Sequence, residues 1–214
     1  LMANVVAVNG PAIVGNLLIV IGVAYLGYII HVVLVYSLSV KVFAKMSPIK
    51  FFKGVLPAAV FAFTSTSSVA SLPVSKECCD EMGVENDISS FVLPLGMTIN
   101  MNGTAIMQVI ATLFIAGCAG YSISFTQLVV IALLALIASA GTPAAPGSGA
   151  IILFTILSGL GYVNDAAMLA YSLILAINRP IEMLVTALNV VGDSATSIYV
   201  AKSEGVLNED VYNA

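Results

Sequence analysis

The stretch from Ile88 to Asn164 contains no aspartate, glutamate, lysine or arginine. A bilayer core about 30 Å thick needs roughly 20 apolar residues in a helix, so this stretch is far too long for one membrane span. Two runs of small and polar residues interrupt it, at 96–104 and 139–149. Because an unpaired backbone amide facing lipid is costly, both interruptions are expected to lie inside protein. Unwound backbone at membrane depth usually lines a substrate or ion site.

The composition excludes an ordinary soluble domain. Hydrophobic residues make up 60% of the 214 residues, charged residues make up 8%, and the mean hydropathy is +1.08. These values are typical of a multi-pass protein of the cell membrane, whose partner is the lipid bilayer. The acidic residues at 77–87 and in the tail are expected in solvated loops. There is no basic patch, so we expect no nucleic-acid partner.

The predicted fold class is an all-α integral membrane protein. Residues 11–40 form an uncharged span, 88–116 form a span interrupted near Asn100, and 164–201 form the last span. The chain begins within hydrophobic sequence, and we expect further N-terminal sequence in the full protein. The predicted segments of one transport domain are 1–47 (first span), 48–87 (first hairpin), 88–120 (interrupted span), 121–162 (second hairpin), 163–205 (last span) and 206–214 (cytoplasmic tail).

Two pairs of short apolar segments predict re-entrant helical hairpins. The first pair meets at a serine-rich tip, 64–68, and the second at the Gly/Pro-rich tip, 141–149. At about 1.5 Å per residue, none of these helices is long enough to cross a bilayer alone. The lysines after the first span place that end in the cytoplasm. The two hairpins then enter from opposite sides, which is the pattern of an inverted repeat.

The last span contains a stripe of polar and charged residues, which is the most specific indication of a functional site in the sequence. Five residues, spaced by three or four positions, fall on one helical face within an apolar segment. Charged groups at mid-membrane are costly, so the stripe is expected to face a polar interior. A structural polar seam, with Arg179 paired only to Glu182, is the alternative. The stripe consists of Arg179, Glu182, Thr186, Asn189 and Asp193.

Together these features suit a carrier of a small charged solute and a cation. Oxygen atoms near Gly96, Thr98 and Asn100, with the Asp193 carboxylate, are candidate ligands for Na⁺. The N-termini of the hairpin helices, at Ser67 and Ser68 and at 147–149, favour an anion such as a substrate carboxylate.

Four motifs in this order resemble the dicarboxylate/amino-acid:cation symporters, over about residues 9–205. The motifs are Ser65-Thr-Ser-Ser-Val-Ala-Ser-Leu-Pro73, Leu93-Pro-Leu-Gly-Met-Thr-Ile-Asn-Met-Asn-Gly-Thr104, Gly141-Thr-Pro-Ala-Ala-Pro-Gly-Ser-Gly149, and Leu188-Asn-Val-Val-Gly-Asp193 with Val200-Ala-Lys-Ser-Glu-Gly205. The resemblance implies the mobile core of an elevator transporter, normally a homotrimer whose scaffold helices lie outside this chain. It also implies a transporter and not an enzyme.

The resemblance implies ligands residue by residue. One sodium site would use Gly96, Asn100, Asn189 and Asp193. A second would use Thr98 with carbonyl groups near Ser139, Ala140 and Thr142, and a third would include Asn102. The implied substrate contacts are Ser68, Thr104, Ala144, Ala145, Gly147, Gly149, Glu182, Thr186 and Asn189, and Ser67 joins them as part of the first tip.

The chain departs from the family pattern at three positions. Val185 stands where acidic-substrate members carry an arginine, and Thr66 stands where archaeal members have an arginine. Asn102 stands where the family carries an aspartate, which removes a carboxylate from the third cation site. We therefore expect a symporter of a small neutral amino acid driven by Na⁺, with H⁺ as the alternative ion. The runner-up is a dicarboxylate or acidic amino acid carrier that uses Arg179. An ion channel is a further alternative, but it would need a continuous polar pore.

Overall fold

The computed structural model describes residues 12–213, and every regular element in this part of the chain is helical. The predicted all-α class is therefore confirmed for these residues. Residues 1–11, where the first predicted span begins, and residue 214 lie outside the described part. The elements, with π-helices marked η, are α2 (Ala12–Ile30), η1 (His31–Tyr36), α3 (Ser37–Ser39), η2 (Val40–Ala44), α4 (Pro48–Ser65), α5 (Ser68–Glu81), α6 (Asn86–Ile99), α7 (Asn102–Cys118), α8 (Phe125–Ala140), α9 (Ser148–Leu160), α10 (Asp165–Ser203) and α11 (Glu209–Asn213).

Three stretches of the described chain are long and apolar enough to cross a membrane. They are Val14–Ala44, Asn86–Cys118 and Asp165–Ser203. Large apolar side chains remain exposed on the outside of the molecule, among them Phe43 and Ile137. Exposed apolar side chains in such number are unfavourable in water and suit lipid.

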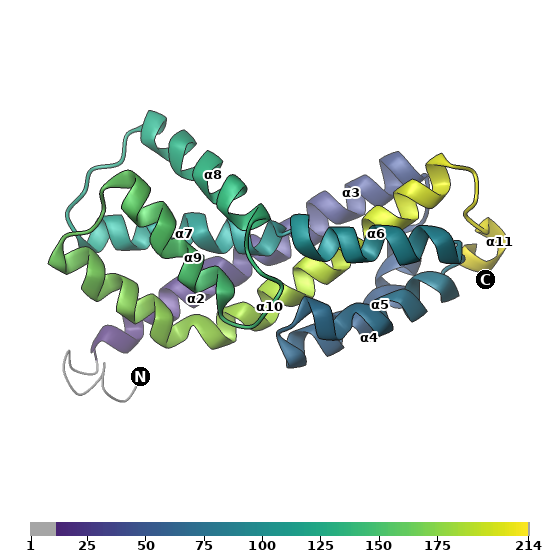
Figure 1. Ribbon diagram of the computed structural model, residues 1–214, viewed down its shortest axis with the longest axis horizontal. Helices are drawn as coiled ribbons and strands as arrows, with labels where there is room; N and C mark the ends of the chain where they lie inside the picture. Colours follow the sequence, from purple (N-terminus) through teal and green to yellow (C-terminus); the bar gives the residue numbers. More distant parts are fainter. Residues whose placement is uncertain (1–11, 214) are drawn as a thin grey trace.

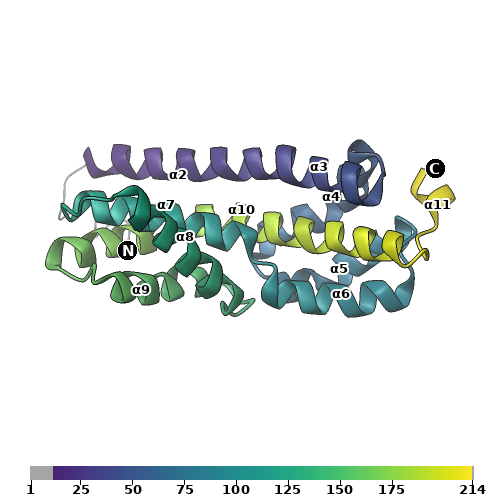
Figure 2. The same cartoon turned by 90° about the horizontal axis from the view of Figure 1, so that it is seen from above.

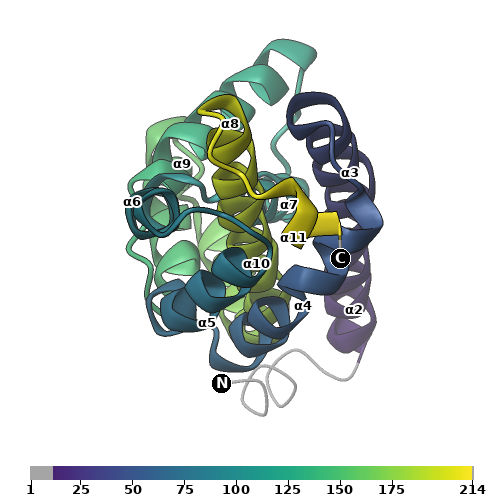
Figure 3. The ribbon, with the colours of Figure 1, turned by 90° about the vertical axis from the view of Figure 1, so that its right-hand side faces the viewer.

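Helix α10 is the axis of the molecule. It runs along the whole length, with α2 beside it (Figures 1 and 2). Viewed from one end, the other helices surround it (Figure 3). It contacts α2, α4, α5, α6, α7 and α9. Residues that α10 places at its middle can therefore be reached from both halves of the structure.

Two helical hairpins occupy opposite halves of the molecule. Helices α4 and α5 form one, helices α8 and α9 form the other, and their tips approach each other near the middle of α10 (Figures 1 and 2). The first hairpin turns at Thr66, whose backbone is left-handed with φ of 54°. An inverted repeat requires such an opposed arrangement, and the re-entrant path of each hairpin through a bilayer stays a prediction.

The break predicted near Asn100 separates α6 from α7. Asn100 and Met101 have non-helical backbone angles. The break lies against α10, because the Asn100 amide donates hydrogen bonds to the backbone oxygen of Asn189 and to the Asp193 carboxylate. The irregular backbone is thus enclosed by protein, as the cost of unpaired amides near lipid requires.

The lysines gather at one end of the molecule. The four lysines at 41–53 lie around the turn from η2 into α4, and Lys202 lies at the end of α10. These element ends are neighbours in Figure 1. The predicted orientation, which places this end in the cytoplasm, rests on this distribution and stays a prediction.

The prediction of solvated loops at 77–87 and in the tail was correct for solvation but wrong for the local structure. Glu77 and Glu81 are exposed but belong to α5, and Glu209 and Asp210 are exposed but belong to α11. The Tyr212 ring is buried, and its hydroxyl donates a hydrogen bond to the Ser47 backbone oxygen at 2.9 Å. Asn208 donates to the Gly83 backbone oxygen at 2.8 Å. Burial of the aromatic ring holds this acidic segment against the fold.

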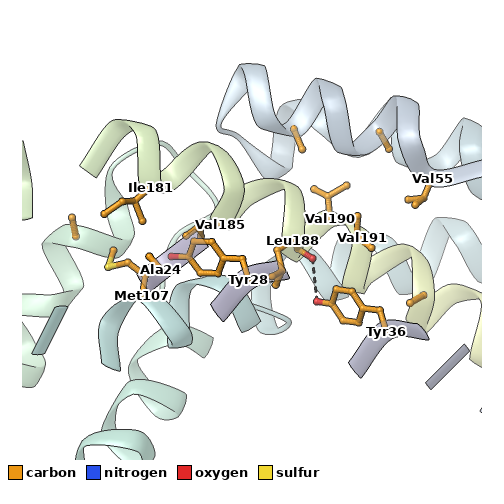
Figure 4. Packing of buried hydrophobic residues seen from close by; sticks show 14 of the residues in the cluster. Ala24, Tyr28, Tyr36, Val55, Met107, Ile181, Val185, Leu188, Val190 and Val191 are labelled. Carbon is orange, nitrogen blue, oxygen red and sulfur yellow. Dashed lines mark hydrogen bonds between the residues drawn. The ribbon is translucent and has the colours of Figure 1, made fainter. Parts of the chain in front are cut away.

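The first span contains two π-helical segments that the sequence did not predict. Tyr36 ends the first of them, and its hydroxyl donates to the Leu188 backbone oxygen of α10 at 3.1 Å (Figure 4). The same hydroxyl accepts a hydrogen bond from Asn102 Nδ2 at 3.2 Å. Tyr28 lies in the same core, 2% exposed, but its hydroxyl has no hydrogen-bond partner among the described residues. The two tyrosines are both buried in this core and differ in the hydrogen bonding of their hydroxyl groups, so each serves as a control for the other.

Replacement of Tyr36 by phenylalanine should lower the free energy of unfolding by about 1–2 kcal/mol, because two buried hydrogen bonds are lost. Replacement of Tyr28 by phenylalanine should be neutral or stabilising, because the hydroxyl that is removed is buried without a partner. Thermal unfolding of both variants in detergent measures the difference. Equal stability of the two variants would contradict this description of the α2–α10 interface.

Candidate functional site

A stripe of buried polar side chains runs along the middle of α10. Glu182, Thr186, Asn189 and Asp193 are each at most 8% exposed. Arg179, the fifth predicted member, has a side chain that is 62% exposed. The prediction that all five share one buried face was therefore wrong for Arg179. At about 100° per residue, Arg179 falls at the edge of the stripe, and its long side chain turns outward.

Asn178 is the polar residue that the sequence reasoning missed at this end of the stripe. It is buried and lines the same pocket as Glu182. It precedes Glu182 by four positions, and Glu182 precedes Thr186 by four. This spacing of four positions predicts that Asn178 belongs to the stripe. Arg179 was assigned to the stripe in its place because it carries a full charge.

Asp193 lies in a cluster of amide side chains at the break between α6 and α7. Asn100 Nδ2 donates to Asp193 Oδ1 at 2.8 Å, and Asn102 Nδ2 donates to Asn100 Oδ1 at 2.9 Å. A Cβ atom on Gly96 would lie 2.6 Å from Asp193 Oδ1, so a larger residue would collide with the carboxylate. The structure thus brings together the predicted cation ligands Gly96, Asn100, Asn102, Asn189 and Asp193.

The donor set of this cluster suits a hard monovalent cation. Within residues 12–213, no three or more His, Cys, Asp or Glu side chains gather where they could hold a metal ion. A cation beside Asp193 would therefore be bound by one carboxylate together with amide and carbonyl oxygens. The Asn100 amide now presents its NH₂ group to Asp193. Rotation of this amide by 180° would present its oxygen to a cation instead.

Asn189 connects this cluster to the start of α7. Its Oδ1 accepts a hydrogen bond from the Gly103 backbone N–H at 2.8 Å, and its Nδ2 donates to Thr104 Oγ1 at 3.3 Å. A Cβ on Gly103 would lie 2.8 Å from the Val185 backbone oxygen. Glycine at this position therefore lets the two helix backbones approach closely, so that Thr104 and Asn189 meet.

The second predicted cation group lies apart from Asp193. The Thr98 side chain is exposed, and its hydroxyl donates to the Leu95 backbone oxygen at 2.7 Å. Ser139 and Thr142 are buried near the end of α8, but their hydroxyls donate to backbone oxygens of their own helix. Ala140 is exposed. Helix α6 does contact α8, but no hydrogen bond links Thr98 to the other three residues.

A small polar pocket lies where the two hairpin tips meet α7 and α10. Its cavity volume is about 30 Å³. Helix N-termini and small side chains come from the hairpins, and polar side chains come from α7 and α10. The predicted substrate residues in its lining are Ser68, Thr104, Ala144, Ala145, Gly149, Glu182, Val185, Thr186 and Asn189.

Two predicted substrate residues are not in this lining. Ser67 caps its own helix, because its Oγ accepts a hydrogen bond from the Ala70 N–H at 3.3 Å. Gly147 directs its N–H at Glu182 Oε1. The lining also contains Ser148, which lies in the predicted anion-binding stretch 147–149. It further contains residues that the sequence analysis did not assign to the substrate site, namely Thr66, Met101, Met107, Thr142, Pro143 and Asn178. Several of these residues lie within the four sequence motifs, and membership of a motif could have identified them as pocket residues.

The two charged side chains at the pocket differ in burial, since the Glu182 carboxylate is buried and the Arg179 side chain is exposed. Glu182 Oε2 is buried and has no hydrogen-bond partner among the described residues. Arg179 Nη1 lies 3.6 Å from that oxygen. This distance is compatible with Coulomb attraction but too long for a hydrogen bond, and the exposure of Arg179 weakens the attraction further. The pocket therefore contains a partly satisfied carboxylate and, at its rim, one guanidinium group.

The chain is similar in sequence to known transporters. The chain is 35% identical over 178 residues to a sodium-dependent excitatory amino acid transporter homologue of Caenorhabditis elegans, 83% of this chain and 35% of that protein. It is 35% identical over 183 residues to human excitatory amino acid transporter 2, 84% of this chain and 31% of that protein. Rat excitatory amino acid transporter 1 is 36% identical over 169 residues, 78% of this chain and 30% of that protein. The chain thus spans about a third of the length of these relatives.

The family assignment covers almost the entire sequence. The sequence model of the sodium:dicarboxylate symporter family matches residues 1–203. This match confirms the resemblance drawn from the four sequence motifs, and the family is one of transporters and not of enzymes. With its apolar spanning helices, the chain is part of a multi-pass protein of the cell membrane. It belongs to the sodium:dicarboxylate symporter family.

Proposed function

We propose that this chain forms the substrate- and ion-binding core of a secondary symporter that couples uptake of a small carboxylate-bearing solute to Na⁺. One observation carries the proposal. Two opposed hairpin tips, the first turn of α7 and the polar stripe of α10 enclose one pocket, and Asp193 lies buried beside it. A pocket closed by hairpins suits alternating access better than the continuous pore that a channel needs.

The pocket offers complementary groups for an amino acid. The N-terminus of α9 supplies backbone N–H groups and a favourable dipole for a carboxylate. The Glu182 carboxylate can receive an ammonium group. Hydroxyl and amide groups of Thr104, Thr186 and Asn189 surround the space between them. These groups fix the orientation of the shared amino acid backbone, and the pocket wall at Val185 is left for the side chain.

Acidic amino acids or dicarboxylates are the first candidates for the substrate. The relatives carry the name excitatory amino acid transporter, and the family description names dicarboxylates. Both names support a dicarboxylate or acidic amino acid carrier, the alternative in the sequence analysis, better than the neutral amino acid carrier that we expected from the sequence. Arg179 is the basic residue nearest to the pocket, 3.6 Å from Glu182. An inward rotation of its exposed side chain would allow a charge-assisted pair with a substrate carboxylate.

A small neutral amino acid is the second candidate, and Val185 favours it. This side chain is 6% exposed and lines the pocket. A substrate carboxylate placed against valine would lose its hydration without gaining a partner, which is unfavourable. The two candidates therefore differ in one physical question, which is whether Arg179 reaches the substrate.

For the coupled ion we propose Na⁺ at the Asp193 cluster, with the amide oxygens of Asn100 and Asn189 as further ligands. Thr98, Ser139, Ala140 and Thr142 are proposed as a second group that assembles when α6 and α8 move closer. H⁺ remains the alternative ion. An elevator motion, re-entrant hairpins and a homotrimer of the full-length protein are proposed from the family resemblance.

Replacement of Asp193 by asparagine should weaken sodium binding by about tenfold or more, because the negative charge that balances the cation is lost. Asparagine can still accept the hydrogen bond from Asn100, so the fold should persist. The measurement is sodium-dependent uptake by the full-length protein in proteoliposomes, titrated with Na⁺. Asp165→Asn, at the exposed start of the same helix, is the matched control. An unchanged sodium titration in Asp193→Asn would exclude this cation site.

Competition among aspartate, succinate, serine and alanine for uptake should separate the two substrate classes. If acidic substrates are carried, aspartate competes best, and Arg179→Ala weakens aspartate by about tenfold or more, since a charge-assisted pair is lost. Val185→Arg should then change little. If neutral substrates are carried, serine or alanine competes best, Arg179→Ala has little effect, and Val185→Arg shifts preference toward aspartate. Absence of competition by all four compounds would contradict the proposed function.

A further inference from the structure

The two hairpin tips differ in how their second helices are capped. Helix α5 is capped by its own Ser67, whose side chain accepts the Ala70 N–H. Helix α9 begins after Gly147, which has a φ of +84° and no side chain to cap the helix. The Gly147 N–H instead donates to Glu182 Oε1 of α10. A carboxylate from another helix thus occupies the anion-favouring end of α9.

The Glu182 carboxylate is satisfied only in part. Its second oxygen, Oε2, is buried without a hydrogen-bond partner among the described residues, and the whole residue is 8% exposed. Arg179 Nη1, at 3.6 Å, is too far away to donate a hydrogen bond. Glu182 is one of the residues that line the pocket. A ligand that enters the pocket could supply the donor that Oε2 lacks.

The pocket is closed in this conformation. A cavity of about 30 Å³ has room for about one water molecule and not for an amino acid. The lining must therefore widen before a substrate can enter, and the tip at 141–149 supplies more of the lining than the first tip does. We take the tip at 141–149 as the part that moves. Such a movement separates Gly147 on the tip from Glu182 on α10, because the hydrogen bond between them joins the two parts.

We propose that Glu182 is an internal latch that holds the α8–α9 hairpin closed over the empty pocket. Its carboxylate occupies the N-terminus of α9 in place of a substrate carboxylate. An incoming substrate carboxylate displaces it, and the freed Glu182 then receives a donor from the substrate. Only this exchange step rests on the proposed function. Closure of the empty hairpin by Glu182 is a property of the chain itself.

The latch depends on the length of the Glu182 side chain. Aspartate keeps the charge but is shorter by one carbon–carbon bond, about 1.5 Å. Glu182→Asp should therefore lose the bond to Gly147. Glutamine keeps the length and one acceptor oxygen, but a neutral acceptor forms a weaker hydrogen bond than a carboxylate. Opening of the hairpin should increase from the parent protein, which retains Glu182, to Glu182→Gln and then to Glu182→Asp.

A cysteine at Met107 reports opening of the hairpin. Met107 is 4% exposed and lines the pocket, and a Cβ on Gly149 of the tip would lie 3.6 Å from its Cε atom. Figure 4 shows its side chain among the residues buried along α10. The reporter needs a Cys118→Ser background because Cys118 is exposed, whereas Cys78 and Cys79 are buried.

The experiment measures the rate at which a water-soluble maleimide labels Met107→Cys in the full-length protein, without Na⁺ or substrate. Labelling should be slow in the parent, faster in Glu182→Gln and at least tenfold faster in Glu182→Asp. Glu204→Asp, at the exposed C-terminal cap of the same helix, should label like the parent. Labelling of Glu182→Asp at the parent rate would overturn the latch. So would labelling of Glu182→Gln as fast as that of Glu182→Asp.

Sodium-dependent uptake by the protein that retains Met107 separates the latch from the proposed function. If labelling follows the expected order but this uptake is absent, the latch stands and the proposed function fails. If uptake is present and all labelling rates are equal, the proposed function stands and the latch fails. Should Glu182→Asp not fold, the comparison of Glu182→Gln with the parent still decides. An equal rate in those two proteins would overturn the latch.

Discussion

A carboxylate buried at the middle of a membrane helix must be compensated by its surroundings, and Asp193 imposes this requirement on the centre of the molecule. The break between α6 and α7 supplies the compensation. It frees the Asn100 side chain to donate to Asp193. Gly96 and Gly192 leave room for the side chains of Asp193, Asn100 and Tyr36. A Cβ on Gly192 would lie 2.5 Å from the Tyr36 hydroxyl and 2.6 Å from Asn100 Nδ2. The irregular backbone, the glycines and the acid therefore depend on one another.

The same requirement explains why the first span departs from a regular α-helix. Tyr36 must reach across to Leu188 and to Asn102. A π-helical turn holds an additional residue and shifts the direction of the side chains that follow it. The segment His31–Tyr36 adopts this geometry immediately before the contact. Tyr36 thus links the first span to the break, although it lies 66 positions before Asn102 in the sequence.

The extent to which the sequence predicts this structure follows from the range of each interaction. Helical periodicity is local, so the polar stripe of α10 and the break at Asn100 could be predicted. The outward turn of Arg179 could not, because it depends on the rotamer of a long side chain at the edge of the stripe. The π-helix at Tyr36 has no repeating pattern that would reveal it. The contact between Gly147 and Glu182 joins residues 35 positions apart and depends on the conformation of the tip.

The capping asymmetry gives the two hairpins different mechanical properties. In the first tip, serine hydroxyls bond to the backbone of their own turn, as Ser71 Oγ does to the Ser67 oxygen at 2.8 Å, and both α4 and α5 pack against α10. That tip is stabilised without help from the pocket. In the second tip, α8 packs mainly on α7 and α9, and α9 takes its cap from Glu182. Because the cap of α9 belongs to the binding pocket, the energy that closes this hairpin depends on what occupies the pocket. A tip with an internal cap has no such dependence, so any gating by pocket contents falls to the α8–α9 hairpin.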